Sequence, residues 1–436
     1  MSRFEAMLSR RDYLRLAVSV SASGWLAPLA RAAATDPARK RSCILLWMSG
    51  GPATIDLFDL KPGHPNGGPF KEIATAAPGV KIGEHLPKLA GHMDRLSVLR
   101  GMSTKEGDHG RATFLMRTGT LPQGAIDFPT FGSLVAKEFR DPGADLPPFV
   151  SIAPERGLAQ NAFSAGFLGP QYAPLIVADG GGGGAAGPQV DQLLKVQDLD
   201  RPAGIGRETA AARLDLMKDL EAGFVSTRPG LTGESHRSAY AAAVRLMKPE
   251  TAKAFDLSDE KPALRDRYGR TLFGQGCLLA RRLVERGVPF VEVTLGGWDT
   301  HQNNHDQVKN LCGILDPAWA TLMQDLKDHG LLDSTTVVWM GEFGRTPKIN
   351  PQKGRDHNNI AWATVIGGGG IKGGQAVGRT SKDGTKVEDR PTDVTDLLAT
   401  VCKGVGIDPE KQNMSNVGRP IRIVDKAAKP VTEVLA

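Results

Sequence analysis

Residues 43–52 read CILLWMSGGP, an unbroken apolar run that stops at a serine and two glycines. Strands that are buried on both faces of a parallel sheet carry such continuous apolar runs. Comparable runs at 96–99, 149–152, 288–295, 335–340 and 363–366 alternate with helical patterns, among them 278–286, 317–329 and 393–402. This alternation predicts an α/β fold, a three-layer sandwich in which a central, mostly parallel sheet lies between layers of helices.

Acidic and imidazole side chains follow these apolar runs. Ligands of open α/β sheets bind at the carboxyl ends of the strands, so residues that come directly after strands are expected to share one edge. Carboxylate oxygen and imidazole nitrogen together suit a divalent cation of hard to borderline character. We therefore predict a site for Zn, Mn or Ca, with the ligands Asp56, Asp299, His301, Glu342 and His357.

Several of these ligand assignments have a structural alternative. In an extended segment Asp299 and His301 point to the same side and can share one ion, but Asp299 can instead cap the next helix. His305 is a third ligand from this segment or a bystander. Glu342 is a metal ligand or the ion-pair partner of Arg345.

Two more features concern anions and the orientation of histidines. Asp356 precedes His357, and a carboxylate in that position can fix the tautomer of a metal-binding imidazole. Ser49 can hydrogen-bond an anion, and the backbone of Gly50 and Gly51 forms an anion nest or merely a turn. These residues extend the predicted site beyond the metal ligands.

His109 and Arg111 are the predicted catalytic residues. They precede the amphipathic stretch 114–116, so they stand at the start of a helix. Free backbone N–H groups and the helix dipole favour an anionic ligand there, and Arg111 would hold an oxyanion. Exposed capping residues would produce the same pattern.

The first 32 residues predict a leader that is exported in folded form. Arg10 and Arg11 form a twin-arginine pattern, an uncharged stretch runs from Leu16 to Ala30, and small residues surround Arg31. The stretch is shorter than the ~20 apolar residues that span a bilayer, so no stable membrane span is expected. We therefore expect the twin-arginine export machinery as a partner and a periplasmic or extracellular location.

The remaining composition is that of an ordinary globular domain. The formal charge is +6, of which the leader, with five arginines against two acids, supplies half. No basic stripe with interleaved aromatics is present, so nucleic acid is not an expected partner. We expect one α/β domain at 41–430 with a mainly helical insertion or cap at about 185–268. The four cysteines are widely spaced, which favours buried free thiols over a disulfide.

Longer motifs resemble a known family. LWMSGGPATIDLFD, GWDTH, ARRLVERGVPFVEV, GEFGRTP and GRDH, with the twin-arginine leader, are similar to domain-of-unknown-function family 1501. That family is placed by fold with the alkaline phosphatase and sulfatase superfamily. The resemblance implies ligand roles for Glu342 and His357, for Asp299 with His301, and for Asp56.

The resemblance also has departures. Phe343 stands where the superfamily would have a histidine of a second metal site, and no Ser, Thr or Cys nucleophile stands in the usual context; His109 occupies about that place. The first hypothesis is a metal-dependent hydrolase of phosphate or sulfate esters, acting on a small molecule or a polysaccharide. The second is a non-catalytic periplasmic module that binds a sugar or a protein.

Overall fold

The computed structural model describes residues 41–436 except 142, 158, 181–183, 197–198, 200–203 and 228–230. The leader predicted at 1–32 lies outside the described residues. Among the described residues, no helix combines the length and the apolar character needed to cross a bilayer.

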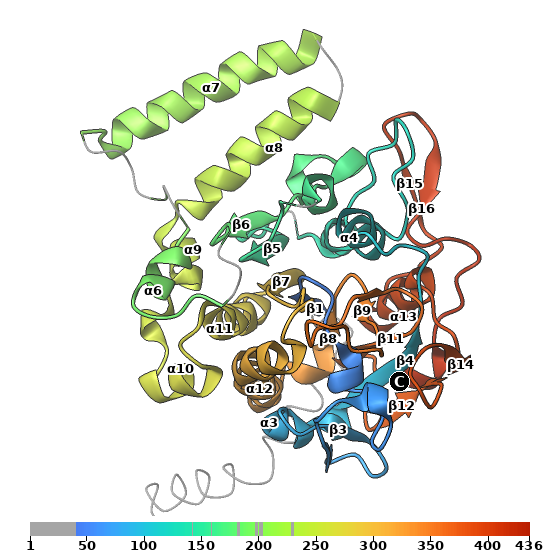
Figure 1. Cartoon of the computed structure of the whole chain (residues 1–436). Helices are drawn as coiled ribbons and strands as arrows, with labels where there is room; N and C mark the ends of the chain where they lie inside the picture. The colour runs from blue at the N-terminus through green and yellow to red at the C-terminus, as the bar shows by residue number, and fades with distance from the viewer. Residues whose placement is uncertain are drawn as a thin grey trace, which may run out of the picture.

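The predicted central sheet is confirmed, and it has eight strands (Figure 1). In spatial order they are β12 (Gln375–Val377), β4 (Leu96–Met102), β11 (Trp362–Gly368), β8 (Thr335–Met340), β1 (Ser42–Met48), β7 (Phe290–Leu295), β5 (Phe149–Ile152) and β6 (Leu175–Val177). Only β11 runs antiparallel to its two neighbours, β4 and β8. Strand β1, which contains the apolar run 43–48, lies between β8 and β7 and is parallel to both.

Helices cover both faces of the sheet. The α-helices of the described residues, not all of which lie on the sheet, are α3 (Pro87–Ala90), α4 (His109–Thr118), α5 (Phe131–Phe139), α6 (Gln189–Leu193), α7 (Arg207–Thr227), α8 (Leu231–Leu246), α9 (Pro249–Ala252), α10 (Pro262–Tyr268), α11 (Leu272–Glu285), α12 (Asn304–Asp328) and α13 (Val394–Val405). Four short two-stranded pairs complete the fold: β2 (Glu72–Ala74) with β3 (Lys81–Gly83), β9 (Gly344–Arg345) with β10 (His357–Asn358), β13 (Arg379–Thr380) with β14 (Val387–Asp389), and β15 (Gln412–Met414) with β16 (Pro420–Arg422).

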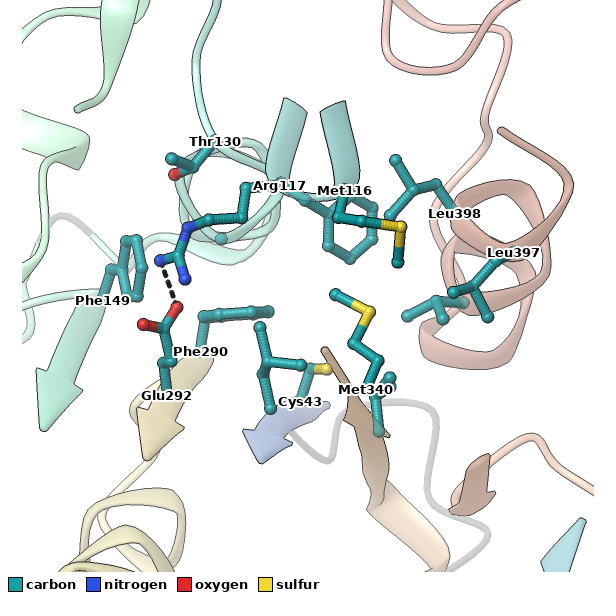
Figure 2. Close-up of a pocket in the computed structure, with 15 residues that line it drawn as sticks. Cys43, Met116, Arg117, Thr130, Phe149, Phe290, Glu292, Met340, Leu397 and Leu398 are labelled. Carbon is teal, nitrogen blue, oxygen red and sulfur yellow. Dashed lines mark hydrogen bonds and ion pairs between the residues drawn. The ribbon is translucent and has the colours of Figure 1, made fainter. Parts of the chain in front are cut away.

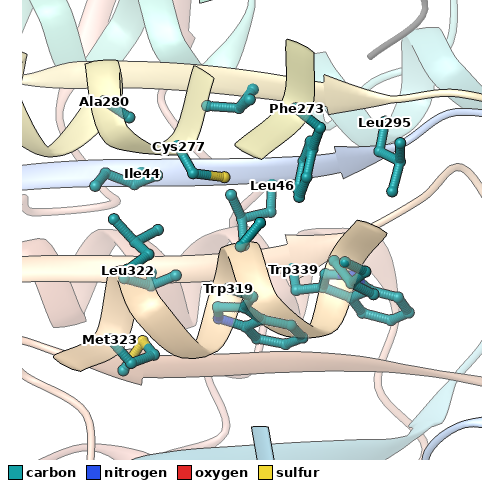
Figure 3. Close-up of a cluster of buried hydrophobic side chains, with 14 of the residues drawn as sticks. Ile44, Leu46, Phe273, Cys277, Ala280, Leu295, Trp319, Leu322, Met323 and Trp339 are labelled. Carbon is teal, nitrogen blue, oxygen red and sulfur yellow. The ribbon is translucent and has the colours of Figure 1, made fainter. Parts of the chain in front are cut away.

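Successive side chains of β1 enter two separate cores, because strand side chains alternate between faces. Ile44 and Leu46 pack toward α11 and α12 (Figure 3). Leu45 and Trp47 belong to the second core, with residues of α4, α5 and α13. Burial on both faces explains why β1 is apolar throughout, and it produces the three-layer sandwich.

Two helices begin earlier than their sequence patterns predict: α11 begins at Leu272 and not at 278, and α12 shows the larger difference. The sequence pattern starts a helix at Pro317, whereas α12 begins at Asn304 and contains Pro317. Val308, Cys312 and Trp319 of α12 are fully buried at helical spacing. Packing of this long apolar face maintains the helix through a residue that usually ends one.

Helices dominate the region expected to be an insertion or cap. It contains α6 to α10, and the antiparallel helices α7 and α8 extend away from the sheet (Figure 1). Leu216 and Leu220 of α7 are more than half exposed. Other residues of this region, among them Val190, Leu246 and Tyr268, are buried in the same core as Ile44 and Leu46.

All four cysteines are buried and free. Burial raises the pKa of the Cys43 and Cys277 thiols well above the usual range. They behave as small apolar groups in the two cores.

A buried ion pair fixes α4 over the sheet. Arg117 of α4 donates to the carboxylate of Glu292 on β7, and both side chains are almost fully buried (Figure 2). Ser151 donates to the other carboxylate oxygen over 3.1 Å, and Arg117 Nε donates to the Ala162 carbonyl over 2.8 Å. The guanidinium also lies 4.0 Å from the ring centroid of Phe163. These contacts hold the helix that begins with His109 against the strand that leads to Asp299.

Removal of either charge of this pair should destabilise the protein strongly. Glu292→Gln leaves the Arg117 charge buried without compensation, which typically costs about 3–5 kcal/mol. Urea unfolding of the purified chain measures the change in the free energy of unfolding. The control is Asp179→Asn, which breaks an exposed pair with Arg156 and should cost less than about 1 kcal/mol. Equal losses in the two variants would contradict the assigned role.

Candidate metal centre

Three imidazoles converge on one carboxylate oxygen at the carboxyl edge of the sheet. The Nε2 atoms of His109, His301 and His357 lie 3.4, 3.1 and 3.5 Å from Asp299 Oδ1. His301 Nε2 is also 3.0 Å from His357 Nε2. His109, Asp299 and His357 form the compact core, since each offers a donor atom within 4.8 Å of the other two. The sequence prediction that Asp299, His301 and His357 share one edge therefore agrees with their positions.

Each histidine has its second ring nitrogen held by an acceptor. His109 Nδ1 lies 2.6 Å from Glu342 Oε1, and His301 Nδ1 lies 2.9 Å from Asp356 Oδ1. His357 Nδ1 lies 2.8 Å from the carbonyl oxygen of Gly107. An acceptor at Nδ1 places the proton there and leaves Nε2 with a free lone pair. All three Nε2 atoms are thus prepared to act as donors to a cation.

The three histidines and Asp299 come from three segments that the fold brings together. His109 is the first residue of α4, and the side chain of Asp108 caps that helix by accepting from the backbone N–H of Arg111. Asp299 and His301 follow β7. His357 begins β10, whose antiparallel partner β9 follows β8.

Two glycines permit the close approach of these loops. Gly50 has φ +110°, and a Cβ there would lie 2.4 Å from the backbone nitrogen of Asp299. A Cβ at Gly354 would lie 1.8 Å from the His301 carbonyl oxygen. Any larger residue at either position would push a ligand-bearing loop outward.

Arg345 links the same loops through its buried guanidinium group. Its Nε donates to the Gly51 carbonyl over 2.9 Å and its Nη1 to the Arg355 carbonyl over 3.2 Å. Its Nη2 donates to the Gly50 carbonyl and to Asp299 Oδ1. Arg345 thus pairs with Asp299, and Glu342 pairs with His109, so the alternative of a Glu342–Arg345 ion pair does not describe this site.

The pKa shifts reflect these pairings. For His109, burial alone would lower the pKa, but the hydrogen bond and charge of Glu342 outweigh it and raise the pKa. Burial lowers the pKa of His357. Burial would raise the pKa of Asp299, yet the hydrogen bond and charge of Arg345 lower it. At neutral pH the site therefore contains a firmly ionised Asp299.

Phe343 fills the position between two of the histidines. Its ring centroid lies 4.9 Å from that of His109 and 4.6 Å from that of His357, and the ring is fully buried. The residue that stands where a second-site histidine would be expected thus packs against the first site.

Two residues from the sequence prediction are not brought into this cluster. Asp56 is buried in a 3-10 turn, where it accepts from Arg355 Nε over 2.9 Å, Arg355 Nη2 over 2.7 Å and Asn304 Nδ2 over 2.7 Å. Arg111 is exposed and pairs with Glu106 over 2.8 Å. It lies two residues after His109, roughly 200° around the helix at 3.6 residues per turn, and therefore points away.

Other residues have roles that differ from those expected. Asp356 orients His301, not the adjacent His357. His305 lies 3.6 Å from Asp56 and belongs to that buried group. His109, predicted to be catalytic, directs Nε2 at Asp299 and counts among the candidate ligands. The Gly107 carbonyl and the linking role of Arg345 were not predicted, because backbone acceptors and loop contacts leave no motif.

The geometry fits a single divalent cation. With metal–nitrogen bonds of 2.0–2.1 Å, tetrahedral ligand atoms lie about 3.3–3.4 Å apart, close to the separations measured from Asp299 Oδ1. His109 Nε2 is buried and has no hydrogen-bond partner, as expected of an atom that is reserved for another ligand. The set of three imidazoles and one carboxylate suits Zn or Mn better than Ca, which prefers oxygen.

Comparison with known proteins assigns the chain to a family. Residues 40–435 match the model of a family described as a protein of unknown function, DUF1501. The chain belongs to this family. No curated protein matches it.

Three solved structures of similar overall fold are the lipoteichoic acid synthase LtaP from Listeria monocytogenes, the PsFucS1 sulfatase from Pseudoalteromonas sp. and an alkaline phosphatase superfamily protein from Vibrio parahaemolyticus. Their identities to this DUF1501 protein are 11%, 14% and 13%, with TM-scores of 0.41, 0.39 and 0.40. The matches cover 88%, 92% and 87% of this chain and 74%, 73% and 74% of those chains. At such identities the similarity concerns the fold alone, and the site is judged from its own geometry.

Loss of the Glu342 carboxylate should weaken metal binding. Glu342→Gln removes the anion that orients His109, and loss of such a partner typically costs 10–100-fold in affinity. Calorimetric titration with Zn²⁺ measures this change. Because Glu342 raises the pKa of His109, binding at pH 7 should also release fewer protons in the variant.

The matched control for this experiment is Glu106→Gln, which breaks a carboxylate contact to Arg111 on the same helix. It should leave Zn²⁺ affinity and proton release unchanged. An unchanged affinity in Glu342→Gln would contradict the placement of His109 among the ligands.

Proposed function

We propose that this chain is an exported, metal-dependent hydrolase of phosphate or sulfate esters, with a small molecule or a polysaccharide as substrate. The observation that carries the proposal is the convergence of three oriented Nε2 atoms on Asp299 Oδ1. The resemblance to family 1501, which is placed by fold with the alkaline phosphatase and sulfatase superfamily, supports the ester class, and the twin-arginine pattern supports export to the periplasm or beyond.

His109, Asp299 and His357 would hold the cation. When bound, a divalent cation supplies Lewis-acid stabilisation of the negative charge that develops on an ester oxygen. Glu342 and the Gly107 carbonyl orient the two imidazoles, and Arg345 holds Asp299 in its ionised form.

His301 lies on the solvent side of this core. Its side chain is 42% exposed, against 14% for His109. With Nδ1 bound to Asp356, its Nε2 is available to take a proton from water or to give one to a leaving group. In this role His301 faces the substrate while the other three residues hold the cation.

One observation favours the second function, a non-catalytic sugar- or protein-binding module: His301 Nε2 lies 3.1 Å from Asp299 Oδ1, near enough to bind the same cation. If His301 is a fourth ligand, four protein atoms close a tetrahedral site, and closed sites are structural. The two functions therefore differ in what His301 does.

Turnover of aryl phosphates and aryl sulfates with added Mn²⁺, Zn²⁺ or Ca²⁺ tests the proposal. The parent protein should show metal-dependent hydrolysis that chelation abolishes. His357→Ala should lose both metal and at least about 10²-fold of the activity, since it removes a ligand and its charge stabilisation. The control is His85→Ala, which removes an imidazole that packs against Phe70 outside the cluster. Its metal content and turnover should equal those of the parent protein.

His301→Ala separates the two functions. A variant that retains metal and loses turnover identifies His301 as a proton carrier in a hydrolase. A variant that loses metal, from a parent with no turnover on either ester class, supports the binding module. The hydrolase is ruled out if the parent protein shows no turnover and contains as little metal as the His301→Ala and His357→Ala variants.

A further inference from the structure

A polar cavity lies at the edge of the sheet opposite the metal centre. It has a volume of about 280 Å³ and is bordered by Pro148 and Pro289, which precede β5 and β7. The metal centre lies beyond the carboxyl ends of these strands. Because a strand rises about 3.3 Å per residue, the length of β7 separates the two sites by roughly 20 Å.

Several elements enclose this cavity. Its walls include the end of α5, the loop before β5, the helices α8 and α9, and the end of α11. It therefore lies where the helical region expected to be an insertion meets the sheet domain. A ligand bound there would contact both parts.

Three arginines line the cavity, and among the described residues no ion pair joins any of them to a carboxylate. Arg140 Nη1 donates to the neutral amide oxygen of Gln171 over 2.7 Å. Arg286 Nη1 donates to the Arg282 carbonyl over 3.3 Å. Arg245 Nε is buried and has no hydrogen-bond partner, which is costly for a charged group unless a ligand supplies an acceptor.

The acidic residues of the lining do not balance this charge. Asp145 is paired with Lys248 over 2.7 Å, and the lining holds two further carboxylates, those of Asp141 and Glu250, against three guanidinium groups. Burial, followed by the neighbouring charge of Arg282, lowers the pKa of Arg286. The excess of positive charge therefore follows from the number of charged groups in the lining, whereas the pKa shift of Arg286 reflects first its burial.

We propose that this cavity binds a small organic molecule through an oxyanion group, namely a phosphate, sulfate or carboxylate. Guanidinium groups match the geometry of such oxyanions with paired hydrogen bonds. A single water needs only about 10–15 Å³ of such volume, so the cavity accommodates far more than one inorganic ion. Leu146 and Pro147 give the organic part an apolar wall.

Calorimetric titration of the full chain with phenylphosphonate, which has no ester bond to hydrolyse, tests this proposal. The His357→Ala background removes binding at the metal centre, and binding should persist there. Arg245→Gln and Arg140→Gln, made separately in that background, should each weaken it by at least about tenfold, since each removes a charged donor. Arg213→Gln, an exposed arginine on α7, is the control and should bind like its parent.

Inorganic phosphate is the second probe. It should bind more weakly than phenylphosphonate, and equal affinity for the two would overturn the organic part of the proposal. Undiminished binding in both arginine variants, or no binding in the His357→Ala background, would overturn the site itself. Unfolding curves of the variants exclude misfolding as the cause of a loss. None of these results depends on whether the metal centre is catalytic.

Discussion

The candidate site depends on one buried guanidinium group, that of Arg345. It donates to the carbonyls of Gly50, Gly51 and Arg355 and to the carboxylate of Asp299. Three loops that would otherwise be independent are thereby joined at one point. A charge buried in this way is tolerated only because every direction of the planar group meets an acceptor.

Charge and exposure change gradually across the site. Glu342 is buried, and it accepts from the Gly50 backbone N–H over 2.9 Å as well as contacting His109. Asp299 is about half exposed, and Asp356 is more so. The inner carboxylate therefore orients an imidazole, whereas the outer side of the cluster is open to solvent. Such an asymmetry suits a cation that is bound from the buried side of the cluster and reached from the solvent side.

The whole fold likewise has a tightly packed part and a part that extends into solvent. The Arg117–Glu292 pair and the two apolar cores hold α4 and β7, which carry His109 and lead to Asp299. Ligands that stand on rigid elements keep their geometry without the metal, because packing has already restricted their side chains. The helices α7 and α8, by contrast, extend from the body (Figure 1). The arginine-lined cavity lies where the helical region meets the sheet.

Much of this could be predicted from local sequence. A run such as CILLWM is typical of a strand that is covered on both faces, and the similar runs along the chain predict a parallel sheet. Polar residues directly after strands predicted one shared edge, which is where Asp299, His301, His357 and Glu342 lie. The spacing of apolar residues and the position of a polar residue relative to a strand are local properties, so a single sequence is enough to identify them.

What only the tertiary structure decided is which partner each polar group finds. Asp56 also follows a strand, yet a short turn directs it into the protein, where Arg355, 299 positions away in the chain, neutralises it. Asp356 orients His301 instead of its neighbour, and Arg345 binds Asp299 instead of the nearby Glu342. The ends of the strands determine the edge of the sheet at which the polar side chains gather. The paths of the loops determine which of these side chains come within hydrogen-bond distance of one another, and those paths depend on contacts between residues far apart in sequence.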